Sequence, residues 1–371
     1  MFGIIFTTVI TICHLYVFWR AFSLPFCRRQ TIRRGLLATG IILWLLFITG
    51  LFYGHSHDNT LAHYLEIGGM TWVGTLFLLT CSQLAVELFS GGGWFFPRLA
   101  PYLRGVALAT GLVLAGIALH QGSQAPVVDS FEVIIPELPL ALDGTVVVAM
   151  SDLHLGTILR EEWLAARIGQ VQELHPDLVL LVGDIFDGHG GNPSKQLSQR
   201  LHTLTAPLGV WGVPGNHEFY GGPQTIKALE EGGVKLLRNS WAEVRPGLIL
   251  AGVEEHTFSR KPEDGAGLIT NALAGRPPGA TLLLSHKPWR AEEAAADGVT
   301  LMLCGHTHGG QIWPFNYLVA RFFPLLAGRY TVANMAILVC RGTGTRGPRM
   351  RLWQPGEIMK ITLRSGPKKL P

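Results

Sequence analysis

The hydrophobic pattern of the chain changes once, near residue 122. Before that point, long apolar runs are separated by short polar segments. A helix needs about 20 apolar residues to cross the hydrocarbon core of a bilayer. The pattern therefore predicts four membrane-spanning helices, at residues 2–19, 35–53, 68–89 and 105–119.

From about residue 127, short β-type runs alternate with helical ones, which is typical of a layered α/β domain. We therefore expect two domains, a transmembrane anchor over residues 1–122 and a second domain over 123–371. Helices are predicted at 161–173, 223–231 and 289–296. Strands are predicted at 145–150, 178–182, 209–213, 248–253, 281–285, 300–304, 336–340 and 358–363.

Composition agrees with a membrane anchor and excludes some partners. Hydrophobic residues make up 48% of the chain and charged residues 15%, which is too apolar for a wholly soluble protein. The net charge is only +4, and no basic run predicts a nucleic-acid-binding surface. The five cysteines lack paired metal-binding spacing, and we expect Cys304 and Cys340 to be buried free thiols.

The basic residues predict how the helices are oriented, because short loops rich in Lys and Arg remain cytoplasmic. No Lys or Arg lies between the second and third spans, and none follows Arg104 until Arg160. We expect a multi-pass cell-membrane protein whose second domain is extracytoplasmic, an orientation that one miscounted span would reverse. Glu87, near the end of the third span, has no assigned role. The basic residues of the other two loops are Arg20, Arg28, Arg29, Arg33 and Arg34, and Arg98 and Arg104.

Polar side chains follow five of the predicted strands at their carboxyl ends. Ligand sites in open α/β sheets gather at that end, so we expect the five segments to converge. Carboxylates, imidazoles and an amide oxygen, without a thiolate, suit Mn, Fe, Co or Zn, and predict a two-metal centre. In chain order the residues are Asp152 and His154, Asp184 and Asp187, Asn216 and His217, His286, and His306 and His308.

Local spacing suggests how these side chains are presented. Alternation in Asp152-Leu153-His154 predicts that its two polar side chains share one side of an extended backbone, and the same holds for His306-Thr307-His308. Glycines precede Asp184, Asn216 and His306, where we expect tight turns.

These motifs resemble the series found in calcineurin-like metallophosphoesterases, and the resemblance covers nearly all of residues 127–364. The sequences GHTHGGQ at 305–311 and RGTGTRGPRMR at 341–351 look like the branch of exported or membrane-attached bacterial phosphodiesterases. The resemblance implies that the second domain is catalytic, with an α/β fold in which four layers form an αββα sandwich. The matching motifs are Asp152-x-His154, Gly183-Asp184-x-x-Asp187, Gly215-Asn216-His217-Glu218, His286 and Gly305-His306-x-His308.

The resemblance also implies a role for each residue. His217 would be the general acid and Asp187 would orient it. Two divalent ions are implied, manganese foremost, with iron, zinc and cobalt as alternatives. The first ion would be held by Asp152, His154, Asp184 and His308. The second would share Asp184 and take Asn216, His286 and His306.

Departures from sibling branches narrow the implied substrate. Gly188 stands where protein Ser/Thr phosphatases have an arginine, and Asp187 stands where purple acid phosphatases have a metal-binding tyrosine. His217 stands where cytoplasmic hydrolases of UDP-diacylglucosamine usually have an arginine. The implied reaction is hydrolysis of a phosphodiester or pyrophosphate, with lipid-linked or cell-envelope substrates as candidates.

Several further residues are candidates for substrate binding. His189 and His256 follow probable strands, so they are expected either to line the cleft or to lie idle in surface loops. Four arginines are expected either to bind phosphate or lipid headgroups or to lie solvated in a loop: Arg341, Arg346, Arg349 and Arg351.

The apolar and aromatic segment 312–326 either enters the lipid headgroup layer or packs against protein. Two other functions stay open at this stage. One is a cytoplasm-facing hydrolase of a nucleotide-linked lipid, and the other is a non-catalytic membrane scaffold with a vestigial metal site.

Overall fold

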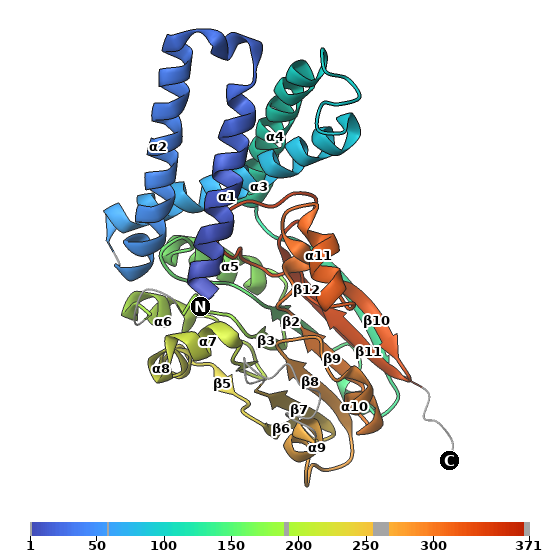
Figure 1. The fold of residues 1–371 in the computed structure, drawn as a ribbon. Coiled ribbons are helices and arrows are strands. Elements are labelled where there is room, and N and C mark those ends of the chain that lie inside the picture. Colours follow the sequence, from blue (N-terminus) through green and yellow to red (C-terminus); the bar gives the residue numbers. More distant parts are fainter. Residues whose placement is uncertain (1, 58, 189–192, 255–266, 367–371) are drawn as a thin grey trace. The chain divides into compact units, whose positions relative to one another are not determined.

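The computed structural model describes residues 2–57, 59–188, 193–254 and 267–366 (Figure 1). The chain forms two compact units. One consists of Met1–Gln124 with Gly347–Trp353, and the other of Ala125–Arg346 with Gln354–Pro371.

The first unit contains four long helices, each long and apolar enough to cross a membrane. Three of the four predicted spans lie within them, and the second ends one residue beyond α2, but the helices extend further. For example, α3 begins eight residues before the predicted span, where the Asn59 side chain caps it by accepting a hydrogen bond from Ala62 N. The helices are α1 (Phe2–Phe22), α2 (Gln30–Phe52), α3 (Thr60–Ser90) and α4 (Ala100–Ser123), with 3-10 turns η1 (Pro25–Arg28) and η2 (Gly54–Ser56).

Small residues and one ion-pair network hold these helices together. A Cβ at Gly111 of α4 would lie 2.9 Å from Leu79 Cα of α3, so the two backbones approach closely there. Near the C-terminal end of α3, the buried Glu87 carboxylate binds Arg20 of α1 at 3.0 Å and Arg104 of α4 at 2.7 Å. The segment Gly347–Trp353 belongs to this unit, since Arg351 N donates to Ala118 O at 2.9 Å.

The second unit is built on two six-stranded sheets. Strands β2 to β5 are parallel in the first sheet, and β7, β8, β9 and β11 are parallel in the second. The first sheet has the order β1 (Val127–Ile135), β12 (Glu357–Ser365), β2 (Val146–Met150), β3 (Leu178–Val182), β4 (Val210–Val213), β5 (Lys235–Leu236). The second has the order β10 (Gly328–Val332), β11 (Met335–Val339), β9 (Leu301–Cys304), β8 (Ala280–Ser285), β7 (Leu248–Val253), β6 (Ser240–Arg245).

Three apolar layers separate the sheets and helices. Between the sheets, Val147 and Leu180 pack in one core with Leu282 and Leu303. The outer face of the first sheet is covered by α5 (Glu161–Gln172), α6 (Lys195–Leu201) and α8 (Pro223–Glu231), and that of the second by α9 (Leu268–Ala272) and α10 (Ala291–Ala296). The predicted αββα sandwich is therefore confirmed. The remaining short elements are η3 (Leu140–Leu142), α7 (Asn216–Gly221), η4 (His308–Gly310) and α11 (Phe315–Phe322).

All eight predicted strands are present, with ends shifted by at most two residues. The four strands that the hydrophobic pattern did not predict are β1, β5, β6 and β10, and each is an edge strand. Cys304 and Cys340 are buried free thiols, as expected.

Candidate metal centre

Five strand ends from both sheets bring the predicted ligands to one place. In the first sheet, β2, β3 and β4 run parallel and end just before Asp152, Asp184 and Asn216. In the second, β8 and β9 run parallel and end just before His286 and His306.

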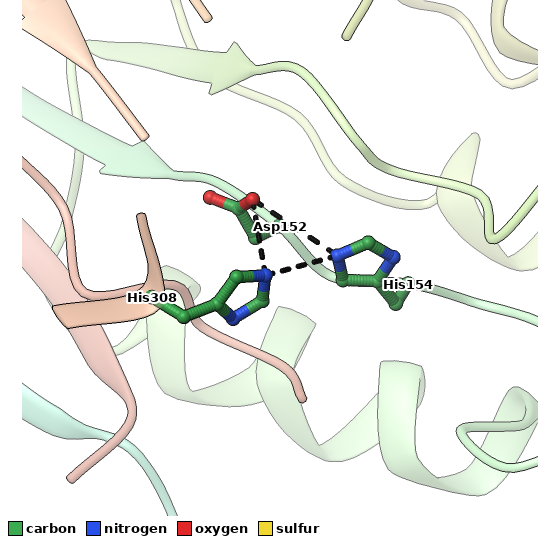
Figure 2. A group of neighbouring side chains, drawn as sticks. All are labelled: Asp152, His154 and His308. Carbon is green, nitrogen blue, oxygen red and sulfur yellow. Dashed lines mark hydrogen bonds and ion pairs between the residues drawn. The ribbon is translucent and has the colours of Figure 1, made fainter. Parts of the chain in front are cut away.

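One group consists of Asp152, His154 and His308, whose polar atoms face one another (Figure 2). His308 Nε2 lies 3.1 Å from His154 Nε2 and 3.3 Å from Asp152 Oδ1. His154 Nε2 is 4.0 Å from the same carboxylate oxygen. All three residues are buried, so this is an enclosed cluster of potential ligands.

A second group consists of Asp184, His286 and His306. His286 Nε2 lies 3.2 Å from Asp184 Oδ2 and 3.2 Å from His306 Nδ1. Asp184 Oδ2 is also 3.9 Å from His154 Nε2, which places this carboxylate between the two groups.

Asn216 is held against the second group by its chain neighbours. The backbone N–H of His217 donates to Asp184 Oδ1 at 2.9 Å, and Gly215 packs against the same side chain. Asn216 is buried, and within the described part of the chain its Oδ1 accepts no hydrogen bond. A buried oxygen in this state is costly unless it has another partner, such as a cation.

The backbone at the ligands differs from the prediction. Five of the seven predicted ligands have a positive φ: Asp152 (54°), His154 (48°), Asp184 (52°), His306 (70°) and His308 (51°). The expectation that Asp152 and His154, or His306 and His308, project from extended backbone was therefore wrong. Left-handed conformations cost non-glycine residues free energy and concentrate at functional sites, where surrounding structure enforces them.

Glycine is required before the ligands for more than one physical reason. Gly183 has a φ of 81°, which fits the expected tight turn. Gly215 has a φ of −97°, so its backbone alone does not require glycine. A Cβ at Gly215 would overlap Asp184 Oδ1, and one at Gly305 would overlap Ser151 Oγ. These two positions need glycine for space.

Glu218 is a positioning residue to which the sequence analysis gave no role, although it stands in the Gly-Asn-His-Glu motif. Its buried carboxylate accepts four backbone N–H groups, and these come from two of the three ligand-bearing loops of the first sheet. The donors are Gly215 at 2.7 Å, Ile185 at 2.8 Å, Phe186 at 2.9 Å and Asp184 at 3.0 Å. The loops after β3 and β4 are thereby fixed to each other.

His217 and Asp187 lie beside the first group. His217 Nδ1 is 3.2 Å from Asp187 Oδ1 and 2.5 Å from Asp187 O, and the His217 ring packs edge-on against the His154 ring. Burial opposes a charge on His217, but the Asp184 charge and the hydrogen bond to Asp187 outweigh it and raise the pKa of the imidazole. His217 is therefore suited to carry a proton near neutral pH.

Comparisons with known proteins agree with this geometry. A family model described as calcineurin-like phosphoesterase matches residues 145–310. An uncharacterized metallophosphoesterase from Aquifex aeolicus is 32% identical over 269 residues, which cover 68% of this chain and 97% of that protein.

The chain belongs to the metallophosphoesterases.

Two further relatives resemble this metallophosphoesterase. A transmembrane protein with a metallophosphoesterase domain from Danio rerio is 31% identical over 77% of this chain and 67% of its own length. An uncharacterized metallophosphoesterase from Campylobacter jejuni is 31% identical over 70% of this chain and 68% of its own length.

The family is dimetal-dependent, and the donor set of this metallophosphoesterase fits two cations. Burial lowers the pKa of His154 to about 4, and burial together with His286 holds the pKa of His306 well below its usual range. Both imidazoles are thus neutral at pH 7, as metal binding requires. Burial opposes a charge on His286, but the Asp184 charge outweighs it and raises the pKa of that imidazole to about 10, so a cation bound there would displace a proton. Ligand atoms that each lie about 2.1 Å from one ion are separated by roughly 3 Å. Four separations within the two groups are 3.1–3.3 Å, and a fifth, from His154 Nε2 to Asp152 Oδ1, is 4.0 Å.

Among His189, His256 and Arg341, which are predicted to bind substrate, the structure describes only Arg341. His189 and His256 lie outside the described residues. The Arg341 guanidinium binds the Asp129 and Glu357 carboxylates, and its backbone N–H donates to Glu357 Oε2 at 2.8 Å. Burial raises the pKa of Glu357 to about 7. Substrate binding by Arg341 stays a prediction, and the structure shows its guanidinium already held by two acids.

Proposed function

We propose that this metallophosphoesterase is a membrane-anchored enzyme that hydrolyses phosphodiester or pyrophosphate bonds at a centre of two divalent ions. The observation that carries the proposal is the pair of ligand groups joined by Asp184, with His217 beside them. Asp152, His154, Asp184 and His308 would hold one ion, and Asp184, Asn216, His286 and His306 the other. Manganese is proposed for both, with iron, zinc or cobalt as alternatives.

When bound, two such ions make water a better nucleophile and neutralise charge on the phosphoryl oxygens. The chain supplies the proton for the departing oxygen. Asp187 faces Nδ1 of His217, so the proton to be donated is the one on Nε2. Asp184 and Asp187 both favour the charged imidazole of His217, which keeps this proton donor protonated.

The proposal assigns residues 1–122 as the membrane anchor and 123–371 as the catalytic domain, on the extracytoplasmic side. Glu87 supports the orientation, because it binds Arg20 at the end of α1 and Arg104 near the start of α4. These helix ends therefore lie on one side of the membrane. That side carries most of the basic residues of the helical region, as cytoplasmic loops do.

The general-acid role is tested with two diesters that differ in their leaving group. His217→Ala should lower kcat/KM for a dialkyl phosphodiester by about 10²–10⁴-fold, since an alkoxide needs a proton to depart. Hydrolysis of bis-nitrophenyl phosphate should fall far less, because nitrophenolate departs unaided. Both rates are measured with the purified full chain and added Mn²⁺.

Asp184→Asn is the inactive control, and Glu231→Gln on the exposed face of α8 is the matched control for a lost carboxylate. Equal losses on both diesters would reject the acid role of His217. Absence of metal-dependent hydrolysis in the native chain would instead favour the non-catalytic scaffold.

A further inference from the structure

Helix α11 is fixed directly against the loop that carries His306 and His308. Gly310 packs so closely on Asn316 that a Cβ at the glycine would overlap the helix backbone. The Phe323 ring lies edge-on to the His306 ring, with centroids 5.0 Å apart, and it stacks on Trp289. Thr307 Oγ1 donates to Leu326 O at 2.5 Å. The position of α11 next to the metal centre is therefore well defined.

The outer face of α11 is apolar. Phe315, Leu318 and Phe322 recur with helical spacing and are 44%, 53% and 68% exposed, and Tyr317 is 68% exposed. Large exposed apolar side chains grouped on one helix face mark a surface that meets apolar material. Arg321 lies in the last turn of the same helix, a common position for a cation at a lipid interface.

Arg346 provides a positive charge next to this helix. Gln311, four residues before α11, donates its Nε2–H to Arg346 O at 3.2 Å and accepts from Arg346 N at 3.0 Å. Two residues earlier, Gly344 N donates to Asp152 O at 3.0 Å. The Arg346 backbone is thus held both to the first ligand group and to the start of the α11 segment.

The Arg346 side chain is exposed, and among the residues that the structure describes no carboxylate pairs with it. The Arg346 charge also acts on the candidate site, because it alone would lower the pKa of His217. An exposed guanidinium at this position can bind a phosphate oxygen with a charge-assisted hydrogen bond.

We propose that α11 and Arg346 form an amphiphile-binding rim, and that the substrate is a phosphodiester or pyrophosphate with a lipid chain, presented from a bilayer. The proposal rests on the proposed phosphoesterase function and adds its substrate class. Arg346 would bind the anionic group, and Phe315, Leu318 and Phe322 would enter the headgroup region beside the lipid chain. A bilayer is the occupant to which we commit, because the same chain carries four helices suited to cross one.

The test compares two substrates with the same nitrophenyl phosphodiester group, one on dioleoylglycerol in phosphatidylcholine vesicles and one on soluble dibutyrylglycerol. The full chain is reconstituted, with Mn²⁺, into the same phosphatidylcholine vesicles that carry the long-chain substrate. The combined Phe315→Ser, Leu318→Ser and Phe322→Ser variant should lower the ratio of kcat/KM for the long-chain substrate over the short-chain one at least tenfold. The Phe315→Leu and Phe322→Leu variant, which keeps Leu318, should retain most of the ratio.

Leu140→Ser and Ile134→Ser are matched controls, since both residues are exposed apolar side chains of the same unit, at 83% and 65%. Arg346→Gln should raise KM for both substrates, and Arg346→Lys should recover part of the loss. An unchanged ratio in the α11 variant, or proportional losses on both substrates, would overturn the rim and leave the phosphoesterase function standing. Failure of the native chain to hydrolyse either substrate would overturn the proposed function itself.

Discussion

Glu218 joins the backbones of two loops that carry proposed metal ligands. Its carboxylate accepts four backbone N–H groups from the segments that carry Asp184 and Asn216. Hydrogen bonds to a charged acceptor contribute about 1.5–3 kcal/mol each. Burial and the Asp184 charge raise the pKa of Glu218 to about 7, and the hydrogen bonds from Phe186 and Gly215 act in the opposite direction.

Glu218→Gln should weaken metal binding about 10–100-fold, the range typical of residues that orient ligands. The physical reason is that the amide NH₂ replaces an acceptor with a donor facing backbone N–H groups. Mn²⁺ titration of the purified chain, followed by electron paramagnetic resonance, measures the affinity. Glu231→Gln serves as the control, and an affinity equal to that of the native chain would show that Glu218 does not position the ligands.

At this scale the sequence predicted which side chains converge, but not how the backbone presents them. Motif spacing identified Asp152, His154 and His308, because residue type follows from metal chemistry. The left-handed φ angles of these residues were not predictable, since they arise from contacts with segments distant in the sequence. The same holds for Gly215, whose missing side chain makes room for Asp184.

Among the strands, the hydrophobic pattern succeeded where both faces are covered. The central strands β3, β7 and β8 are completely buried and read as continuous apolar runs. Edge strands such as β1 mix Asp129, Ser130 and Glu132 with apolar residues, because much of their surface meets water. The hydrophobic pattern did not predict these strands for that reason. It also missed α11, whose exposed apolar face resembles neither a core helix nor a surface loop.

Among the helices, the Glu87 carboxylate of α3 binds arginines of both α1 and α4, and so joins three helices. Removing one partner of a buried ion pair costs about 3–5 kcal/mol, since the remaining charges stay desolvated. Glu87→Ala should therefore lower the thermal unfolding midpoint of the detergent-purified chain by several degrees. Arg34→Ala, which removes an exposed charge from α2, should leave it nearly unchanged. A midpoint unaltered by Glu87→Ala would mean that the network does not stabilise the helical unit.

For the whole molecule, orientation across the membrane is the feature on which substrate access depends. Four spans and the distribution of arginines predict that residue 125 lies outside the cytoplasm. Alkaline phosphatase fused after residue 125 should be active, and a green fluorescent protein fusion exported through the same pathway should be dark. Fusions after residue 95 should give the reverse result. A bright fluorescent fusion after residue 125 would favour the cytoplasm-facing alternative.

The origin of the ligands in two separate sheets has a mechanical consequence. Asp152, Asp184 and Asn216 are rooted in one sheet, while His286 and His306 are rooted in the other. The distances among these side chains therefore depend on how the two sheets pack against each other, through side chains such as Leu180 and Leu282. A substitution in the apolar core between the sheets, remote from the reacting atoms, would shift the proposed ligands of one sheet relative to those of the other. It would impair the proposed catalysis before the fold itself is lost.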